Sequence, residues 1–212
     1  MKHIRLFILG LVLILGTAAS AQESGWIRVN LQDKLTINLP IDWSISDKNQ
    51  RQAISEWAKK LINNSEIHTT SLSAASYPQP SNAFVRVSFL TLDQPLSQIE
   101  VIRMLKLERK TTMEGLAEMW SSESPQLWNS LAKVGIREVG HPSFSNELIG
   151  GKMALTISYA RTSSTISSGV MDVTQYHIPN GSEKVLITIS KIRGDKNAEN
   201  STHNIMNSIA IN

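Results

Sequence analysis

Apolar and polar residues alternate along two short runs, Trp26–Leu31 and Leu35–Leu39. A period of two predicts strands with one buried face, and the spacer that contains Gln32 and Asp33 predicts a β-hairpin between them. Pro40 has no backbone N–H to donate, so we expect the second strand to end there. The chain is therefore expected to open its folded part with a hairpin.

A helical pattern follows, with Ser46 or Asp47 as the N-cap and an end near Asn63. Its inward stripe is Ile54, Trp57, Ala58 and Leu61. The stretch from Ser71 to Asn82, rich in Ser, Ala and Pro, is interpreted as a loop. Alternation resumes from Ala83 to Leu92 and predicts a central strand, with one side formed by Val85, Val87 and Phe89.

The longest helical pattern extends from Leu96 to Ser122. Its apolar stripe is Ile99, Ile102, Leu105, Met113, Leu116 and Trp120. Arg109 falls within this stripe, so either the helix breaks near residue 110 or the Arg stem is tucked along its apolar neighbours. We expect a second break before Pro125, with a short helix from there to Lys133.

The rest of the chain is rich in strand patterns. Asn180-Gly181 lies between two alternating runs and predicts a tight hairpin turn, because both residues tolerate a positive φ. Gly150-Gly151 is interpreted as a turn before a strand. The predicted strands are Val134–Val139, Lys152–Arg161, Val170–Ile178 and Val185–Ile192, and Asp195–Ile209 is predicted as a closing helix.

Successive hairpins without intervening helices indicate an antiparallel sheet. No internal repeat or long linker divides the chain. We therefore expect one α+β domain over residues 22–212, built as an antiparallel β-sheet flanked by helices.

Three local patterns resemble those of the Mog1/PsbP-like fold, which includes DcrB-type bacterial envelope proteins. They are the early strand closed by Pro and Trp (Leu35–Trp43), the late hairpin (Tyr176–Ile189) and the terminal helix phrase Ile205–Ile209. The resemblance implies an α/β/α sandwich and no shared chemistry. Proteins of this fold are mostly accessory proteins that bind other proteins.

Residues 1–21 have the three parts of a secretory signal peptide. Lys2 and Arg5 precede the apolar run Leu6–Leu15, and small residues follow up to Ala21. Export would leave a protein of the periplasm or the extracellular space. The chain has no cysteine, which excludes a lipid-anchoring cysteine, thiol catalysis and Cys-ligated metal centres.

Charge gives little guidance on partners. Lys2 and Arg5 belong to the predicted signal and are two of the 21 Lys and Arg residues, which face 18 Asp and Glu residues. The exported chain would therefore carry about +1. Such a balance argues against nucleic acid as a partner.

No motif for catalysis, cofactor or metal binding is present, so we assign none of these sites. Scattered histidines give weak support for a metal: His68, His141, His177 and His203. Ser143 and Ser145 are interpreted as loop residues around Pro142. Glu114 and Glu118, four residues apart and near Lys110, are typical of a solvated ion-pair face.

One basic edge stands out on the long helix. Arg103, Lys106 and Lys110 could meet an acidic partner, and we take them as the candidate partner-binding residues. The leading hypothesis is a non-enzymatic exported accessory domain that binds another envelope or secreted protein. An inhibitor or immunity protein against a secreted toxin belongs to the same class.

Two other classes stay open. A carrier of a small apolar ligand is suggested by Met104, Met113, Met119 and Met153, and it requires an apolar cavity of a few hundred Å³. A hydrolase would require catalytic residues assembled from distant loops.

Overall fold

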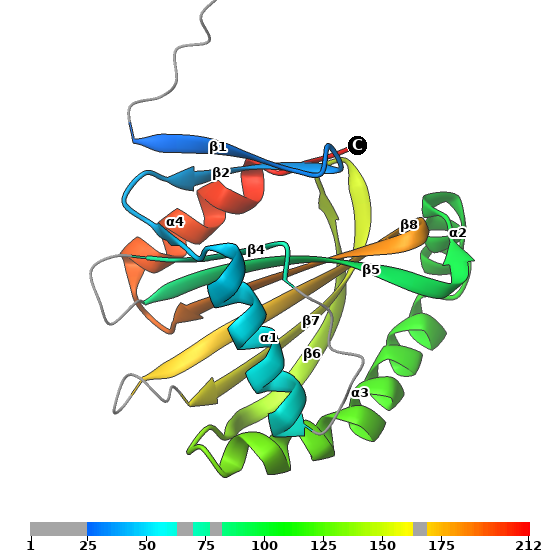
Figure 1. Ribbon diagram of the computed structural model, residues 1–212. Helices are drawn as coiled ribbons and strands as arrows, with labels where there is room; N and C mark the ends of the chain where they lie inside the picture. Colours follow the sequence, from blue (N-terminus) through cyan, green and yellow to red (C-terminus); the bar gives the residue numbers. More distant parts are fainter. Residues whose placement is uncertain (1–24, 63–69, 77–81, 163–168) are drawn as a thin grey trace, which may run out of the picture.

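The computed structural model describes residues 25–62, 70–76, 82–162 and 169–212 (Figure 1). The predicted signal peptide and His68 lie outside this part of the chain. The same is true of the side chains of Trp57, Ala58 and Leu61 in the predicted inward stripe.

The strands form two antiparallel sheets. A three-stranded sheet has the order β1-β2-β9, with β1 at Trp26–Leu31, β2 at Leu35–Pro40 and β9 at Ala210–Ile211. A six-stranded sheet has the order β3-β4-β5-β8-β7-β6. Its strands are β3 (Ser44–Ile45), β4 (Leu72–Ala75), β5 (Ala83–Leu96), β6 (Glu138–Ile149), β7 (Lys152–Thr162) and β8 (Val170–Ile192).

Helices lie on both faces of the larger sheet (Figure 1). They are α1 (Lys48–Ile62), α2 (Gln98–Leu107), α3 (Arg109–Ala132) and α4 (Lys196–Asn207). α4 packs on β2, β5 and β8, whereas α3 contacts α1 and places its tryptophans on Tyr159, on the other face. The predicted α+β class, with helices flanking antiparallel strands, is confirmed.

The first hairpin forms as predicted. Gln32 and Asp33 adopt φ angles of 55° and 54°, the left-handed pair that a two-residue type I′ turn requires. Asn30 supports the turn, because its Oδ1 accepts from the Asp33 backbone N–H at 3.0 Å. The side chains of Leu35 and Ile37 are then fully buried.

The main hydrophobic core lies between the small sheet, α4 and the facing side of β5 and β8. It contains β-branched and leucine side chains from all of these elements, fully buried at Ile37, Leu39, Val85, Val87, Ile178, Ile187 and Ile205. Burial of such side chains contributes about 1.5–3 kcal/mol each. Because the chain has no cysteine, this packing carries the stability that disulfides supply in many exported domains.

β8 is a continuous run that turns back on itself. Its first part pairs with β7 and its second part pairs with β5. The two ends meet, since the Arg193 N–H donates to the Val170 carbonyl at 2.9 Å. Gly181 takes φ 73° at the reversal, which confirms the hairpin predicted from Asn180-Gly181.

Two strands occupy segments that we interpreted as loops. β4 lies within the predicted loop 71–82, and its backbone pairs with β5. β6 includes Ser143 and Ser145, and it is the edge strand of the sheet. Its register shifts between Val139 and Ser143, around Pro142. An edge strand with such an irregularity tolerates a proline, so the loop interpretation was wrong.

The long predicted helix breaks once, close to the first expected break near residue 110 and not at the second. Glu108 has φ −136° and ψ 36°, which separates α2 from α3, and Arg109 is exposed rather than tucked. α3 continues through Pro125 to Ala132, so the predicted break there was wrong. Trp120 and Trp128, on either side of Pro125, both pack on Tyr159, at ring distances of 5.0 and 5.6 Å.

The C-terminal segment closes the small sheet. The predicted closing helix is α4, with Asp195 as its N-cap, and β9 follows it. β9 was not anticipated from the sequence. Leu35 pairs with Ile211, and the Asn212 backbone N–H donates to the Lys34 carbonyl at 3.0 Å.

Candidate functional site

One surface suited to binding surrounds the junction of α2 and α3. Ser97 begins α2 with a capping box: its side chain accepts from the Glu100 N–H, and the Glu100 carboxylate accepts from the Ser97 N–H at 2.8 Å. The Ser97 hydroxyl also donates to the Glu100 carboxylate at 2.7 Å. This hydrogen bond and the one from the Ser97 N–H lower the pKa of Glu100. We call the α2–α3 junction at Glu108 the elbow.

The inner face of α2 packs on the sheet and is hydrogen-bonded to β7 and β8. Val101 and Leu105 are buried. The Gln98 amide bridges two strands: its Nε2 donates to the carbonyls of Met153 and Pro179, at 3.1 and 2.6 Å. Its Oε1 accepts from the Met153 N–H at 2.6 Å. α2 is therefore held in a fixed orientation.

The outer face of α2 combines apolar and basic side chains. Ile99 and Leu107 are 79% and 74% exposed. Arg103 and Lys106 lie between them in sequence, are exposed, and have no carboxylate within 4 Å among the described residues. These four residues share one side of the helix at spacings of four, seven and eight. We call them the elbow stripe.

The three predicted partner-binding residues are all exposed, but the structure divides them between two helices. Arg103 and Lys106 belong to α2, whereas Lys110 lies in the first turn of α3. Lys110 forms an (i, i+4) ion pair with Glu114 at 3.7 Å, the solvated pairing expected from the sequence. The sequence predicted that Ile99 faces inward, and this was wrong because its side chain is exposed. Ile99 therefore adds an apolar side chain to the basic edge.

A pocket of about 300 Å³ lies beneath the elbow, on the other flank of α2. Its walls are three apolar side chains, two cations and one amide: Ile102, Leu105, Met153, Lys106, Arg109 and Asn146. We call it the elbow pocket. It meets the size requirement for a carrier of an apolar group, and Met153 is the one predicted methionine among its lining residues.

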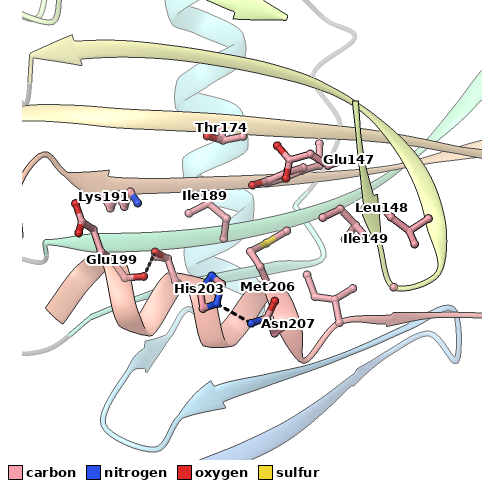
Figure 2. Close-up of a pocket in the computed structure, with 14 residues that line it drawn as sticks. Glu147, Leu148, Ile149, Thr174, Ile189, Lys191, Glu199, His203, Met206 and Asn207 are labelled. Atoms are coloured by element: carbon pink, nitrogen blue, oxygen red, sulfur yellow. Dashed lines mark hydrogen bonds between the residues drawn. The ribbon is translucent and has the colours of Figure 1, made fainter. Parts of the chain in front are cut away.

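The second surface is a cleft of about 420 Å³ beside α4, shown in Figure 2. α4 forms one wall, and β6 and β8 with the turn at Gly150 form the other. The cleft is lined by apolar residues, with polar groups around them: Ile149, Ile189, Met206, Glu147, Thr174, Tyr176, Lys191, Glu199, His203 and Asn207.

The polar groups of this cleft are mostly engaged with each other or with α4. His203 Nε2 and Asn207 Nδ2 are 2.9 Å apart (Figure 2). Lys196 donates to Glu199 at 2.9 Å, and the Thr202 hydroxyl donates to the Ala198 carbonyl at 2.7 Å. Burial and the nearby Glu147 carboxylate raise the pKa of Tyr176 to about 12.

These contacts do not form a catalytic set. A nucleophile requires a base within hydrogen-bond distance and a third group that orients the base. In the cleft, His203 is bonded to an amide rather than to a carboxylate or a nucleophilic hydroxyl. Among the described residues, no group of three or more His, Asp or Glu side chains is arranged to hold a metal ion.

The histidines are far apart in the fold. His141 is exposed on β6 and His203 is exposed on α4. His177 lies in β8, where burial and the charge of Lys184 lower its pKa to about 3. A neutral, largely buried imidazole is therefore part of the packing between strands.

No helix of the described residues is long and apolar enough to cross a membrane.

Of the comparisons with known proteins, the one with solved structures gives information on the fold. No family model matches the chain, and no curated protein sequence matches it. Cyanobacterial PsbP (CyanoP) from Synechocystis sp. PCC 6803 is similar in structure, with a TM-score of 0.50 and 12% identity over 93% of this chain and 99% of that one. The fold is thus Mog1/PsbP-like, as the resemblance predicted.

Two further solved structures are similar at lower scores. LpqN, involved in cell envelope biogenesis of Mycobacterium tuberculosis, has a TM-score of 0.43 and 12% identity over 88% of this chain and 90% of that one. A protein from Bacteroides thetaiotaomicron has a TM-score of 0.46 and 7% identity over 89% of this chain. This chain spans 48% of the length of the Bacteroides chain.

The site residues that sequence reasoning missed belong to the elbow. Ile99 and Leu107 are eight residues apart with Arg103 between them, a spacing that places all three on one side of a helix. Ser97-x-x-Glu100 was a further signal in the sequence, because this capping box marks where α2 begins.

Proposed function

We propose that this protein is an exported, non-enzymatic accessory domain that binds another protein of the envelope through the elbow stripe. The observation that carries the proposal is the exposure of Ile99 and Leu107 beside Arg103 and Lys106 on one short helix. Large apolar side chains are costly to leave in water, and a group of them with flanking charges is typical of a binding surface.

The charge of the stripe supports an acidic partner surface. Arg103 and Lys106 have no ion pair with the described residues, so they are available to carboxylates of another chain. Opposite charges at the rim would speed association, and burial of the two apolar side chains would contribute most of the affinity. The anchoring of Gln98 to two strands keeps the surface preorganised.

The test is affinity capture with the chain that export would leave, residues 22–212, from the native envelope. Ile99→Asp with Leu107→Asp should abolish capture of a specific protein, because two charges would replace the apolar contact. Arg103→Glu with Lys106→Glu should weaken capture at least tenfold through repulsion of an acidic partner. Mass spectrometry and a direct titration with the identified partner measure both effects.

A matched control makes the same charge change elsewhere. Lys48, at the start of α1, and Lys133, at the end of α3, are both exposed and lie outside the stripe. Lys48→Glu with Lys133→Glu should leave capture intact. Equal capture by the stripe variants and this control would refute the proposal.

A further inference from the structure

We propose that the elbow pocket binds an anionic amphiphile, with its hydrocarbon chain against Ile102, Leu105 and Met153 and its negative head at Lys106 and Arg109. The pocket lies on a different flank of α2 from the apolar residues of the elbow stripe. The proposal goes beyond protein binding and shares only Lys106 with the elbow stripe.

The apolar part of the pocket accounts for the hydrocarbon chain. Ile102 and Leu105 come from α2, and Met153 comes from β7 across the pocket. Water removed from these side chains would contribute about 25 cal/mol per Å² of apolar area.

The charged part of the pocket accounts for the anionic head. Lys106 and Arg109 are the two charged residues of the lining, which contains no carboxylate. Both are exposed, and neither has a hydrogen bond or an ion pair with the described residues. A cation pair beside an apolar wall matches a molecule with an anionic head on a hydrocarbon chain.

The pocket lining also contains one uncharged polar side chain. The Asn146 amide lines the pocket, and its Oδ1 is buried without a hydrogen-bond partner among the described residues. Its Nδ2 donates to Met153 Sδ at 3.5 Å. A buried amide oxygen left unpaired costs about 1–3 kcal/mol, and a hydroxyl or amide hydrogen of a ligand would satisfy it.

The first experiment uses decanoate as the probe and calorimetry with ¹³C-methyl methionine spectra as readouts. Decanoate should bind and shift the Met153 methyl signal, while the signal of Met171, buried in the sheet, should stay in place. Lys106→Gln with Arg109→Gln should weaken the decanoate affinity about tenfold, equivalent to about 1.4 kcal/mol.

Two controls separate this proposal from the proposed function. Decyltrimethylammonium has the same chain with a positive head and should bind at least tenfold more weakly than decanoate. Arg103→Gln with Lys110→Gln removes the same charge outside the pocket and should leave decanoate binding unchanged. Ile102→Phe, which fills the pocket, should abolish the Met153 shift while protein capture persists.

Vesicles separate a dissolved amphiphile from a bilayer lipid. The protein should be tested with phosphatidylcholine vesicles and with a two-to-one mixture of phosphatidylcholine and phosphatidylglycerol. Binding of decanoate or of the anionic vesicles supports the proposal if it depends on Lys106 and Arg109. No Met153 shift with either probe, or equal binding of the cationic amphiphile, would overturn it.

Discussion

His177 is a titratable side chain within the sheet, and its environment couples folding to pH. Burial and the Lys184 charge lower its pKa from 6.5 to about 3. Its Nε2 is 3.3 Å from Gln175 Oε1, a contact available to a neutral ring that carries its proton there. The folded protein therefore binds fewer protons here than the unfolded chain between pH 6.5 and 3, so stability falls as the pH falls through this range.

We expect His177→Gln to flatten this acid dependence. Between pH 7 and pH 4.5 the wild-type free energy of unfolding should drop by about 2 kcal/mol more than that of the variant. Urea denaturation at the two pH values measures the difference. His141→Gln, at an exposed position, should retain the wild-type dependence, and the same slope in both variants would contradict the assignment.

Only glycine can occupy position 150 without strain. Its φ is +55°, and a Cβ there would lie 3.1 Å from the Ile209 carbonyl and the Ile211 backbone nitrogen. Gly151, next in the turn, has φ +78° but open space around it. The two positions separate the cost of the backbone conformation from the cost of a close contact with β9.

Gly150→Ala should therefore lower the free energy of unfolding by about 2–3 kcal/mol, and Gly151→Ala by about 1 kcal/mol. Thermal and urea unfolding of the two variants check the order. A Gly151→Ala cost equal to or larger than that of Gly150→Ala would show that the contact with β9 is unimportant.

At the scale of elements, α3 shows how tertiary packing overrides a local signal. Pro125 lacks the N–H that would bond to the Ser121 carbonyl, and it favours a break on sequence grounds. The tryptophans at 120 and 128 nevertheless pack on the same tyrosine, and they pack edge to face with each other at 6.4 Å. That contact depends on a continuous helix, so the proline is tolerated.

Pro125→Ala should stabilise the protein by about 1–3 kcal/mol, because it restores a backbone donor and removes a steric clash. Pro125 is exposed, so no packing should be lost. Asn129→Ala, at an exposed position of the same helix, should gain only a few tenths of a kcal/mol. Melting temperatures of both variants give the comparison, and destabilisation by Pro125→Ala would show that the proline is needed for the shape of α3.

The elements that could be predicted from the sequence are those with strong alternation and clear turn chemistry. The first hairpin, β5, β7 and the arms of β8 all have this pattern, and Asn180-Gly181 marked the reversal. β4 was missed because it is short. The strand predicted at Val134–Val139 overlaps β6 (Glu138–Ile149) only at its start, because the rest of β6 is polar. Pairing with neighbouring strands, rather than their own residues, makes these segments strands. The sequence predicted the elbow only as one of two alternatives, a helix break near residue 110 or a tucked Arg109 stem. Arg109 interrupts the apolar stripe, but it does not show where the helix ends.

At the scale of the whole molecule, the fold joins distant parts of the chain. Lys34 donates to Glu183 at 2.6 Å, which fastens the first hairpin to the β8 reversal. β2 pairs with β9, and Asn180 Nδ2 donates to the Asn212 carbonyl at 3.3 Å. The small sheet, the core and α4 therefore depend on each other.

Removal of residues 210–212 should lower the free energy of unfolding by about 2–4 kcal/mol. The deletion exposes Leu35, removes the buried Ile211 side chain and breaks the hydrogen bonds to the Asp33 and Lys34 carbonyls. Chemical denaturation and hydrogen exchange at β1 and β2 measure the loss. Asn212→Ala is the control and should cost less than half as much, whereas an unchanged exchange rate after the deletion would contradict the role of β9.

The pairing of β2 with β9 also sets the order in which the molecule can be completed. One partner lies among the earliest described residues and the other follows every other described element, so this contact spans nearly the whole folded chain. Contacts of such sequence separation form late and slow folding. Until β9 pairs, the edge of β2 is open and the core beneath it is uncovered, so the small sheet is completed only when these two distant parts of the described chain have come together.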